Sequence, residues 1–123
     1  MSFQYNLNYI GGINGYNKRA VYTLKIKDNC FLVNGLIKSK KFSYNQVIKI
    51  VFGTTDELKE SISEVKNMIF NHVKLLDYRM NRKLHYCLVI ILKDTTIIFA
   101  EEHEANIKNA YQRLNAVYHL TKK

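Results

Sequence analysis

Seven basic side chains within residues 18–41 are the residues best suited to binding chemistry. Residues 1–55 hold eight basic residues against one acidic residue, Asp28, which gives this segment a charge of +7 out of +9 for the whole chain. Such asymmetry favours an anionic partner, because lysine and arginine neutralise phosphates and carboxylates. Lysines on strand edges also serve a second purpose, which is to keep those edges in water. The candidate binding residues are Lys18, Arg19, Lys25, Lys27, Lys38, Lys40 and Lys41.

Catalysis finds little support in the sequence. The four histidines share no metal-ligand spacing with the two cysteines, and the chain holds no GxxxxGK[ST], GxSxG or HExxH motif. The stretch GGINGYNK (residues 11–18) is rich in glycine but lacks the strand-loop-helix context of a phosphate cradle. Glu101, Glu102 and Glu104 suit the start of a helix better than acid-base work. We therefore expect no enzyme, no bound metal and no cofactor.

The composition predicts one folded domain over residues 1–123. The chain is 47% hydrophobic and contains no proline, which favours a single core without a rigid linker. No secretory signal is visible, and the longest apolar run, LHYCLVIIL (residues 84–92), is too short to cross a membrane. Cys30 and Cys87 lack CxxC spacing, so we expect reduced thiols and a cytoplasmic protein.

The first half of the chain has the period-two pattern of strands. Polar and apolar residues alternate in residues 5–9 and again in residues 20–27, where alternate side chains from Ala20 to Ile26 form one face and Lys25 and Lys27 belong to the other. Turn pairs follow at residues 28–29 and 34–35, and Asn45-Gln46 forms a corner. After that corner, Ile48, Ile50 and Phe52 are expected to point to the same side.

The pattern becomes helical after Gly53. Residues 54–57 read as a capping box, and apolar residues then recur at spacings of three and four as far as Leu76, which predicts one amphipathic helix of about five turns. A basic connector (residues 78–83) leads to a hairpin that turns at Lys93-Asp94. A last helix opens at residues 101–104 and is expected to bury Leu114 and Val117.

Three stretches resemble the pleckstrin-homology-like (PH-like) domains of bacterial proteins. They are YIGGINGYNKRAVYTLKIKDNCFLVNG for the opening strands, FSYNQVIKIVF for the corner, and EEHEANIKNAYQRLNAV for the terminal helix. The resemblance implies an α+β fold, namely a PH-like antiparallel β-barrel or sandwich with a C-terminal capping helix. The predicted helix at about residues 55–77 is then an insertion into that fold.

The resemblance also bears on ligands. In lipid-binding PH domains a K-x(n)-[K/R]-x-R pattern lies near the first loop, and Lys18, Lys25 and Lys27 fall in its register. The last position is lysine, which keeps the charge but loses the bidentate geometry of arginine toward phosphate.

The sequence as a whole predicts a non-catalytic binding module, most simply for a protein partner, in a small mobile-element or regulatory protein. Two alternatives stay open: a nucleic-acid-associated protein that uses the basic N-terminal half, and binding of anionic lipid headgroups at a membrane surface. The inserted helix offers a surface for a partner or for homo-oligomer formation.

Overall fold

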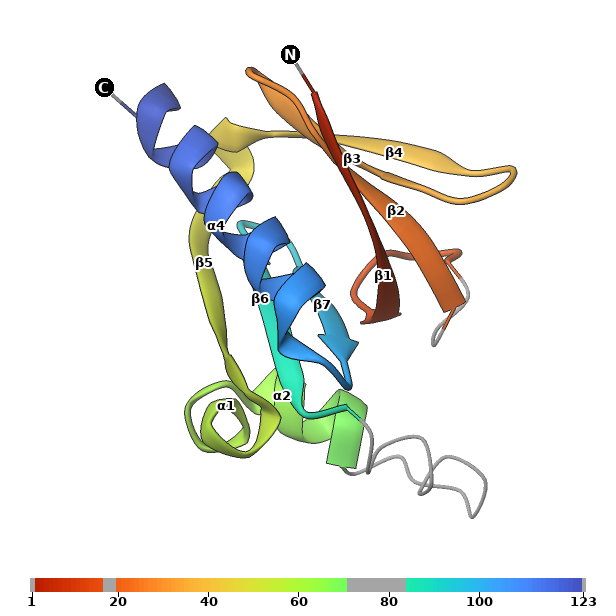
Figure 1. Cartoon of the computed structure of the whole chain (residues 1–123), viewed down its shortest axis with the longest axis vertical. Helices are drawn as coiled ribbons and strands as arrows, with labels where there is room; N and C mark the ends of the chain where they lie inside the picture. Colours follow the sequence, from red (N-terminus) through yellow and green to blue (C-terminus); the bar gives the residue numbers. More distant parts are fainter. Residues whose placement is uncertain (1, 17–19, 71–83, 123) are drawn as a thin grey trace.

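The computed structural model describes residues 2–16, 20–70 and 84–122, and within them seven strands form one antiparallel sheet (Figure 1). The sheet order is β4-β3-β2-β1-β7-β6-β5. The strands are β1 (Phe3–Gly11), β2 (Ala20–Ile26), β3 (Cys30–Asn34), β4 (Ser39–Ser43), β5 (Val47–Thr54), β6 (Tyr86–Leu92) and β7 (Thr96–Glu101). The helical elements are η1 (Tyr44–Gln46), α1 (Thr55–Ser61), α2 (Ser63–Val65), η2 (Lys66–Phe70) and α4 (Glu104–Thr121).

The sheet is open, with β4 and β5 at its two ends. The α+β class, the antiparallel strands and the C-terminal helix are therefore confirmed, whereas a closed barrel is not observed. We call β1–β4 the first half-sheet and β5–β7 the second half-sheet. They join where β1 pairs with β7 at Tyr9–Phe99 and Gly11–Ile98.

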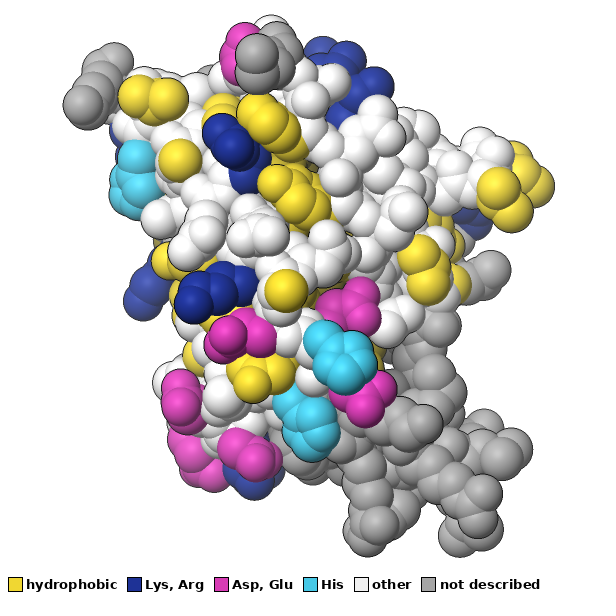
Figure 2. All heavy atoms as spheres, viewed as in Figure 1, with side chains coloured by type: hydrophobic (Ala, Val, Ile, Leu, Met, Phe, Trp, Pro, Cys, Tyr) yellow, Lys and Arg dark blue, Asp and Glu magenta, His cyan; other side chains and the backbone are white. Residues whose placement is uncertain are grey.

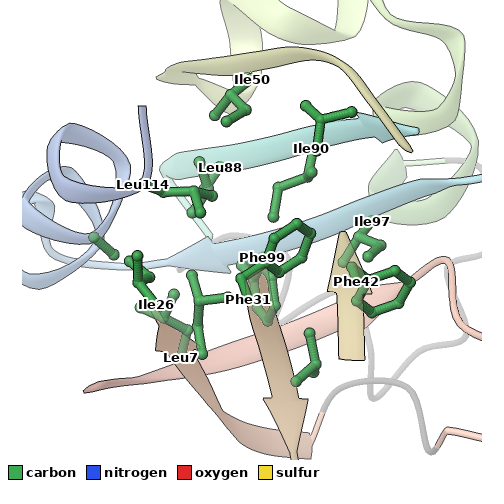
Figure 3. Packing of buried hydrophobic residues seen from close by; sticks show 14 of the residues in the cluster. Leu7, Ile26, Phe31, Phe42, Ile50, Leu88, Ile90, Ile97, Phe99 and Leu114 are labelled. Atoms are coloured by element: carbon green, nitrogen blue, oxygen red, sulfur yellow. The ribbon is translucent and has the colours of Figure 1, made fainter. Parts of the chain in front are cut away.

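One apolar cluster joins the two half-sheets and α4. The sheet bends so that side chains of the first half-sheet, such as Phe31 and Phe42, meet those of the second, such as Ile90 and Phe99 (Figure 3). Helix α4 adds Leu114, which is fully buried, while Val117 is only partly buried. We call this side of the sheet the inner face. The alternation read from the sequence marks the same face, with Leu24 and Ile26 buried on β2.

A second cluster lies on the opposite, outer face and involves the second half-sheet and the end of β1. Val89, Ile98 and Cys87 are fully buried there, packed with Leu58 of α1 and Val65 of α2. Because β6 and β7 are covered on both faces, they read as continuous apolar runs rather than as alternating ones. The outer face of the first half-sheet instead carries polar side chains such as Thr23, which donates to Asn6 at 2.7 Å.

The predicted five-turn helix is interrupted. Thr54 caps α1 as expected, because its hydroxyl accepts a hydrogen bond from the Glu57 N–H at 3.2 Å. The helix then ends at Ser61, and Ile62 has extended backbone angles (φ −126°, ψ 107°). Serines on both sides of Ile62 favour such a break because their hydroxyls compete for backbone groups. The break turns the chain so that Val65 packs under the sheet, whereas residues 71–77 of the predicted helix lie outside the described residues.

A second expectation is wrong at the start of β5. Ile48 is 57% exposed, while Val47 and Ile50 are buried. The pairing of β5 with β6 shifts register between Val47 and Lys49. This bulge adds one residue and turns Ile48 away from the face of Ile50, as an extra residue in a strand must do.

Candidate binding surface

The seven basic candidates do not share one face. Strand register places Lys25 of β2 beside Leu32 of β3, and Leu32 beside Lys41 of β4. Since side chains across paired strands share a face, Lys25 and Lys41 both project from the outer face, about 10 Å apart across two strand spacings. The sequence pattern instead pairs Lys25 with Lys27, which lies beyond the end of β2 at Ile26.

The other candidates point elsewhere or are not described. Lys40 pairs with the buried Val33, so it belongs to the inner side, where its ammonium lies 5.5 Å from the centre of the Phe42 ring. The Lys38 ammonium donates to the carbonyl of Gly15. Lys27 lies just past the end of β2, where it lines a shallow hollow next to Asp28. Lys18 and Arg19 lie outside the described residues.

The described part of the glycine-rich loop between β1 and β2 packs onto the protein. The Tyr9 hydroxyl accepts a hydrogen bond from the Ile13 N–H at 2.6 Å, and the Tyr16 hydroxyl donates to the Val33 carbonyl at 2.8 Å. Tyr16 also stacks on Tyr22, with ring centres 4.9 Å apart. Burial raises the pKa of Tyr9 and of Tyr16 above the ordinary value. Residues 12–16 therefore brace the inner face instead of forming an open phosphate cradle.

A feature that sequence reasoning missed lies at the end of the β3–β4 hairpin. Leu36 and Ile37 are 107% and 97% exposed, and Figure 2 shows hydrophobic side chains at the projecting end of this hairpin, on the right of the view. Together with Val21 they border a hollow of about 300 Å³. We call this the tip surface; its lining residues are Ala20, Val21, Tyr22, Gly35, Leu36, Ile37 and Lys38.

The hairpin holds the tip in place. The Gly35 N–H donates to the Lys38 carbonyl at 2.6 Å, and the Ser39 hydroxyl donates to the Asn34 side-chain oxygen at 2.5 Å. The Tyr22 ring lies so close to Gly35 that a Cβ there would approach its Cε1 to 2.6 Å. Close packing on Tyr22 thus fixes the base of the turn, and the two aliphatic side chains project into water.

The charge around the tip surface has one sign. Lys38 belongs to it, Lys40 and Lys41 follow closely in sequence, and no acidic residue occurs from position 29 to position 55. Acidic side chains gather instead over α1, at the opposite end of the molecule (Figure 2). An apolar tip with a lysine rim is therefore the arrangement that the structure offers to a partner.

Two kinds of feature are not found in the described ranges: a group of metal-ligating side chains and a membrane-spanning helix. Within residues 2–16, 20–70 and 84–122, no three His, Cys, Asp or Glu side chains are grouped so as to hold a metal ion. In the same ranges no helix has the length and apolar character needed to span a bilayer.

The fold and surface define an α+β domain with an open, seven-stranded antiparallel sheet and an exposed apolar hairpin tip. No protein-family model, no curated protein and no solved structure matches the chain.

Proposed function

We propose that the chain is a non-catalytic binding module on a PH-like scaffold, and that its tip surface binds an acidic partner protein. The observation that carries the proposal is the full exposure of two adjacent aliphatic side chains, Leu36 and Ile37. Single exposed aliphatic residues are common on protein surfaces, but a pair on a braced, projecting turn with Val21 beside it forms a patch.

Three features of the fold support the PH-like scaffold. Strands β1–β4 form one antiparallel meander and β5–β7 form a second, and β7 returns to pair with β1. A capped turn at Ser43–Gln46 forms the corner between β4 and β5. Helix α4 then packs on the inner face. The open sheet and the helical segment after β5 are departures from the expected pattern.

The shape and chemistry of the tip surface favour a protein over a nucleic acid. Nucleic-acid binding needs several cations that track a phosphate backbone, but Lys25 and Lys41 lie on the outer face while Lys40 lies on the other. Aliphatic side chains contribute little to phosphate binding. They suit the buried centre of a protein interface, where a polar rim surrounds an apolar core.

The test uses a double substitution at the tip. We expect Leu36→Ser/Ile37→Ser to weaken binding of the native partner, purified after capture from the source cells, by about a hundredfold or more, because burial of each aliphatic side chain contributes about 1.5–3 kcal/mol. Isothermal titration calorimetry with the purified partner measures the change. The matched control is Leu120→Ser on α4, since Leu120 is an exposed aliphatic residue outside the tip surface.

Two further arms separate the alternatives. Vesicles that contain anionic phospholipid and a double-stranded DNA oligonucleotide are titrated with the same variants. Retention of partner affinity in the tip variant would overturn the proposal. Tip-dependent binding to vesicles or to DNA, without any tip-dependent protein binding, would replace the protein partner by that ligand.

A further inference from the structure

Strand β5 is the edge strand at one end of the sheet. One of its sides pairs with β6, and no strand of the described residues pairs with the opposite side. The Thr55 N–H donates to the His85 carbonyl at 2.9 Å, continuing the antiparallel register in which Gly53 faces Cys87 and Val51 faces Val89. Alternate residues of an antiparallel strand bond to the same neighbour, so Val51 and Gly53 bond toward β6. The backbone groups of Ile50 and Phe52 therefore point away from the sheet, along its open edge.

The open edge has a limited length. At its start the Tyr118 hydroxyl donates to the carbonyls of Val47 and Ile48, at 3.1 and 3.4 Å. At its end the chain enters α1 after Thr54. The segment from Lys49 to Thr54 remains, and apart from Lys49 it contains no charged residue and no proline to block pairing.

Charges of opposite sign lie at the two ends of this segment. Lys49, Val51 and Gly53 share the outer face, because side chains alternate along a strand. Lys49 is exposed near the start of the segment. At the other end the Glu57 carboxylate lies over Gly53, 3.6 Å from the place where a Cβ would stand. Among the described residues neither Lys49 nor Glu57 takes part in an ion pair.

We propose that two copies of this chain pair through their β5 edges, antiparallel, with the two-fold axis at Val51. This register places Ile50 opposite Phe52 of the second copy, so that their outward backbone groups bond in both directions. It also places Lys49 opposite Gly53 of the second copy, beside the Glu57 carboxylate that covers that glycine. A two-fold contact repeats each interaction, so one dimer holds two Lys49–Glu57 pairs.

The β4 edge lacks this self-complementarity. It carries Lys40 and Lys41, with Lys38 at the turn before it. Two β4 strands placed side by side would bring like charges together, which disfavours pairing. The second copy is therefore the occupant that fits β5.

The first experiment follows mass against concentration by sedimentation velocity at low salt. We expect the wild-type chain to dimerise, and Lys49→Glu or Glu57→Lys alone to weaken the dimer by about tenfold, because each change opposes like charges twice. The double variant Lys49→Glu/Glu57→Lys should regain wild-type affinity, since it exchanges the two charges of each pair. Lys40→Glu, on the other edge, is the control and should leave the dimer unchanged.

The second experiment tests the register without charge changes. Val51 residues that face each other at a position without cross-strand hydrogen bonds have Cβ atoms about 5 Å apart, close enough for a Val51→Cys variant to form a disulfide-linked dimer on mild oxidation. Val21→Cys, an exposed position on β2 away from the β5 edge, should form no disulfide-linked dimer under the same conditions. A wild-type chain that stays monomeric at every concentration, or a double charge exchange that fails to restore the dimer, would overturn the proposal.

Discussion

The first half-sheet leaves its outer face in water, whereas the second half-sheet is covered on both faces. On the first, Thr23 projects outward from β2 between Asn6 of β1 and Asn34 of β3, and Lys25 projects outward on the same face. On the second, Val89 and Ile98 project outward into a cluster closed by α1 and α2. The inner faces of both half-sheets are apolar and meet in one core.

The two half-sheets therefore differ in role: the second contributes mainly stability, and the first presents exposed side chains. The covered half-sheet buries apolar surface on both sides and so contributes more stability for each strand. The uncovered half-sheet needs one apolar face only, which leaves β2, β3 and β4 free to carry lysines and the tip surface. The edges differ in the same way, since β4 has the sequence SKKFS and β5 the sequence VIKIVFGT.

The largest expected loss of stability comes from a substitution at the junction where β1 pairs with β7, which we call the seam between the half-sheets. Gly12 has a φ of +118°, and a Cβ there would lie 2.1 Å from the Thr96 carbonyl oxygen and 2.8 Å from the Ile97 Cα. Gly12→Ala must therefore push β1 and β7 apart, and we expect it to lower the free energy of unfolding by about 4 kcal/mol or more. Urea denaturation followed by circular dichroism measures the loss.

Gly15→Ala is the matched control for the seam. Gly15 also has a positive φ, +82°, but a Cβ there would meet the Lys38 ammonium at 3.5 Å and otherwise open space. Its cost should stay at about 1–2 kcal/mol, the strain of a left-handed residue with a side chain. Equal losses in the two variants would show that backbone strain, and not contact between the half-sheets, sets the effect at Gly12.

Alanine substitutions on the outer faces of the two half-sheets should cost different amounts of stability, and both should cost less than Gly12→Ala. Ile98→Ala removes a fully buried side chain from the outer cluster, and we expect a loss of about 3 kcal/mol. Thr23→Ala removes one exposed hydrogen bond, to Asn6, and should cost about 0.5 kcal/mol. Similar values for the two substitutions in the same denaturation assay would contradict the claim that only the second half-sheet buries its outer face.

Strands were predictable from the sequence where burial alone sets the order of polar and apolar residues. Alternation from Ala20 to Ile26 identifies a strand with one buried face, and the continuous run at residues 84–92 identifies one buried on both. The bulge at Ile48 was not predictable, because one inserted residue reverses the face without changing the composition. The break in the helix at Ile62 was also not predictable, because the helical spacing of apolar residues continues through it. The extended backbone of Ile62 is set by the burial of Val65 against the sheet.

The candidate surface was predictable in composition but not in geometry. The lysines of β4 are plain in the sequence, yet whether Lys40 or Lys41 joins Lys25 on the outer face depends on strand register. The exposed Leu36 and Ile37 directly follow the turn pair that the sequence predicts at residues 34–35. The turn pair Asn34-Gly35 was a usable signal for a turn, and hairpin loops are normally polar, but the last strand pair, Asn34–Ser39, is what places Leu36 and Ile37 in the loop.

The last and smallest expected effect concerns pH and the covered half-sheet. Cys87 lies in the outer cluster, and burial there raises the pKa of its thiol to about 12, from an ordinary value of 9.0. Between those values the unfolded chain loses the thiol proton while the folded chain keeps it, so the free energy of unfolding falls as pH rises above 9. The slope for one group is at most about 1.4 kcal/mol per pH unit. Urea unfolding with reductant between pH 8 and about pH 10, before most tyrosines ionise, measures it. Cys87→Ala should be less stable at every pH and should lose this slope, because no thiol remains to ionise on unfolding. The same slope in both proteins would mean that water reaches Cys87 in the folded chain, and that α1 and α2 do not seal the outer face of the second half-sheet.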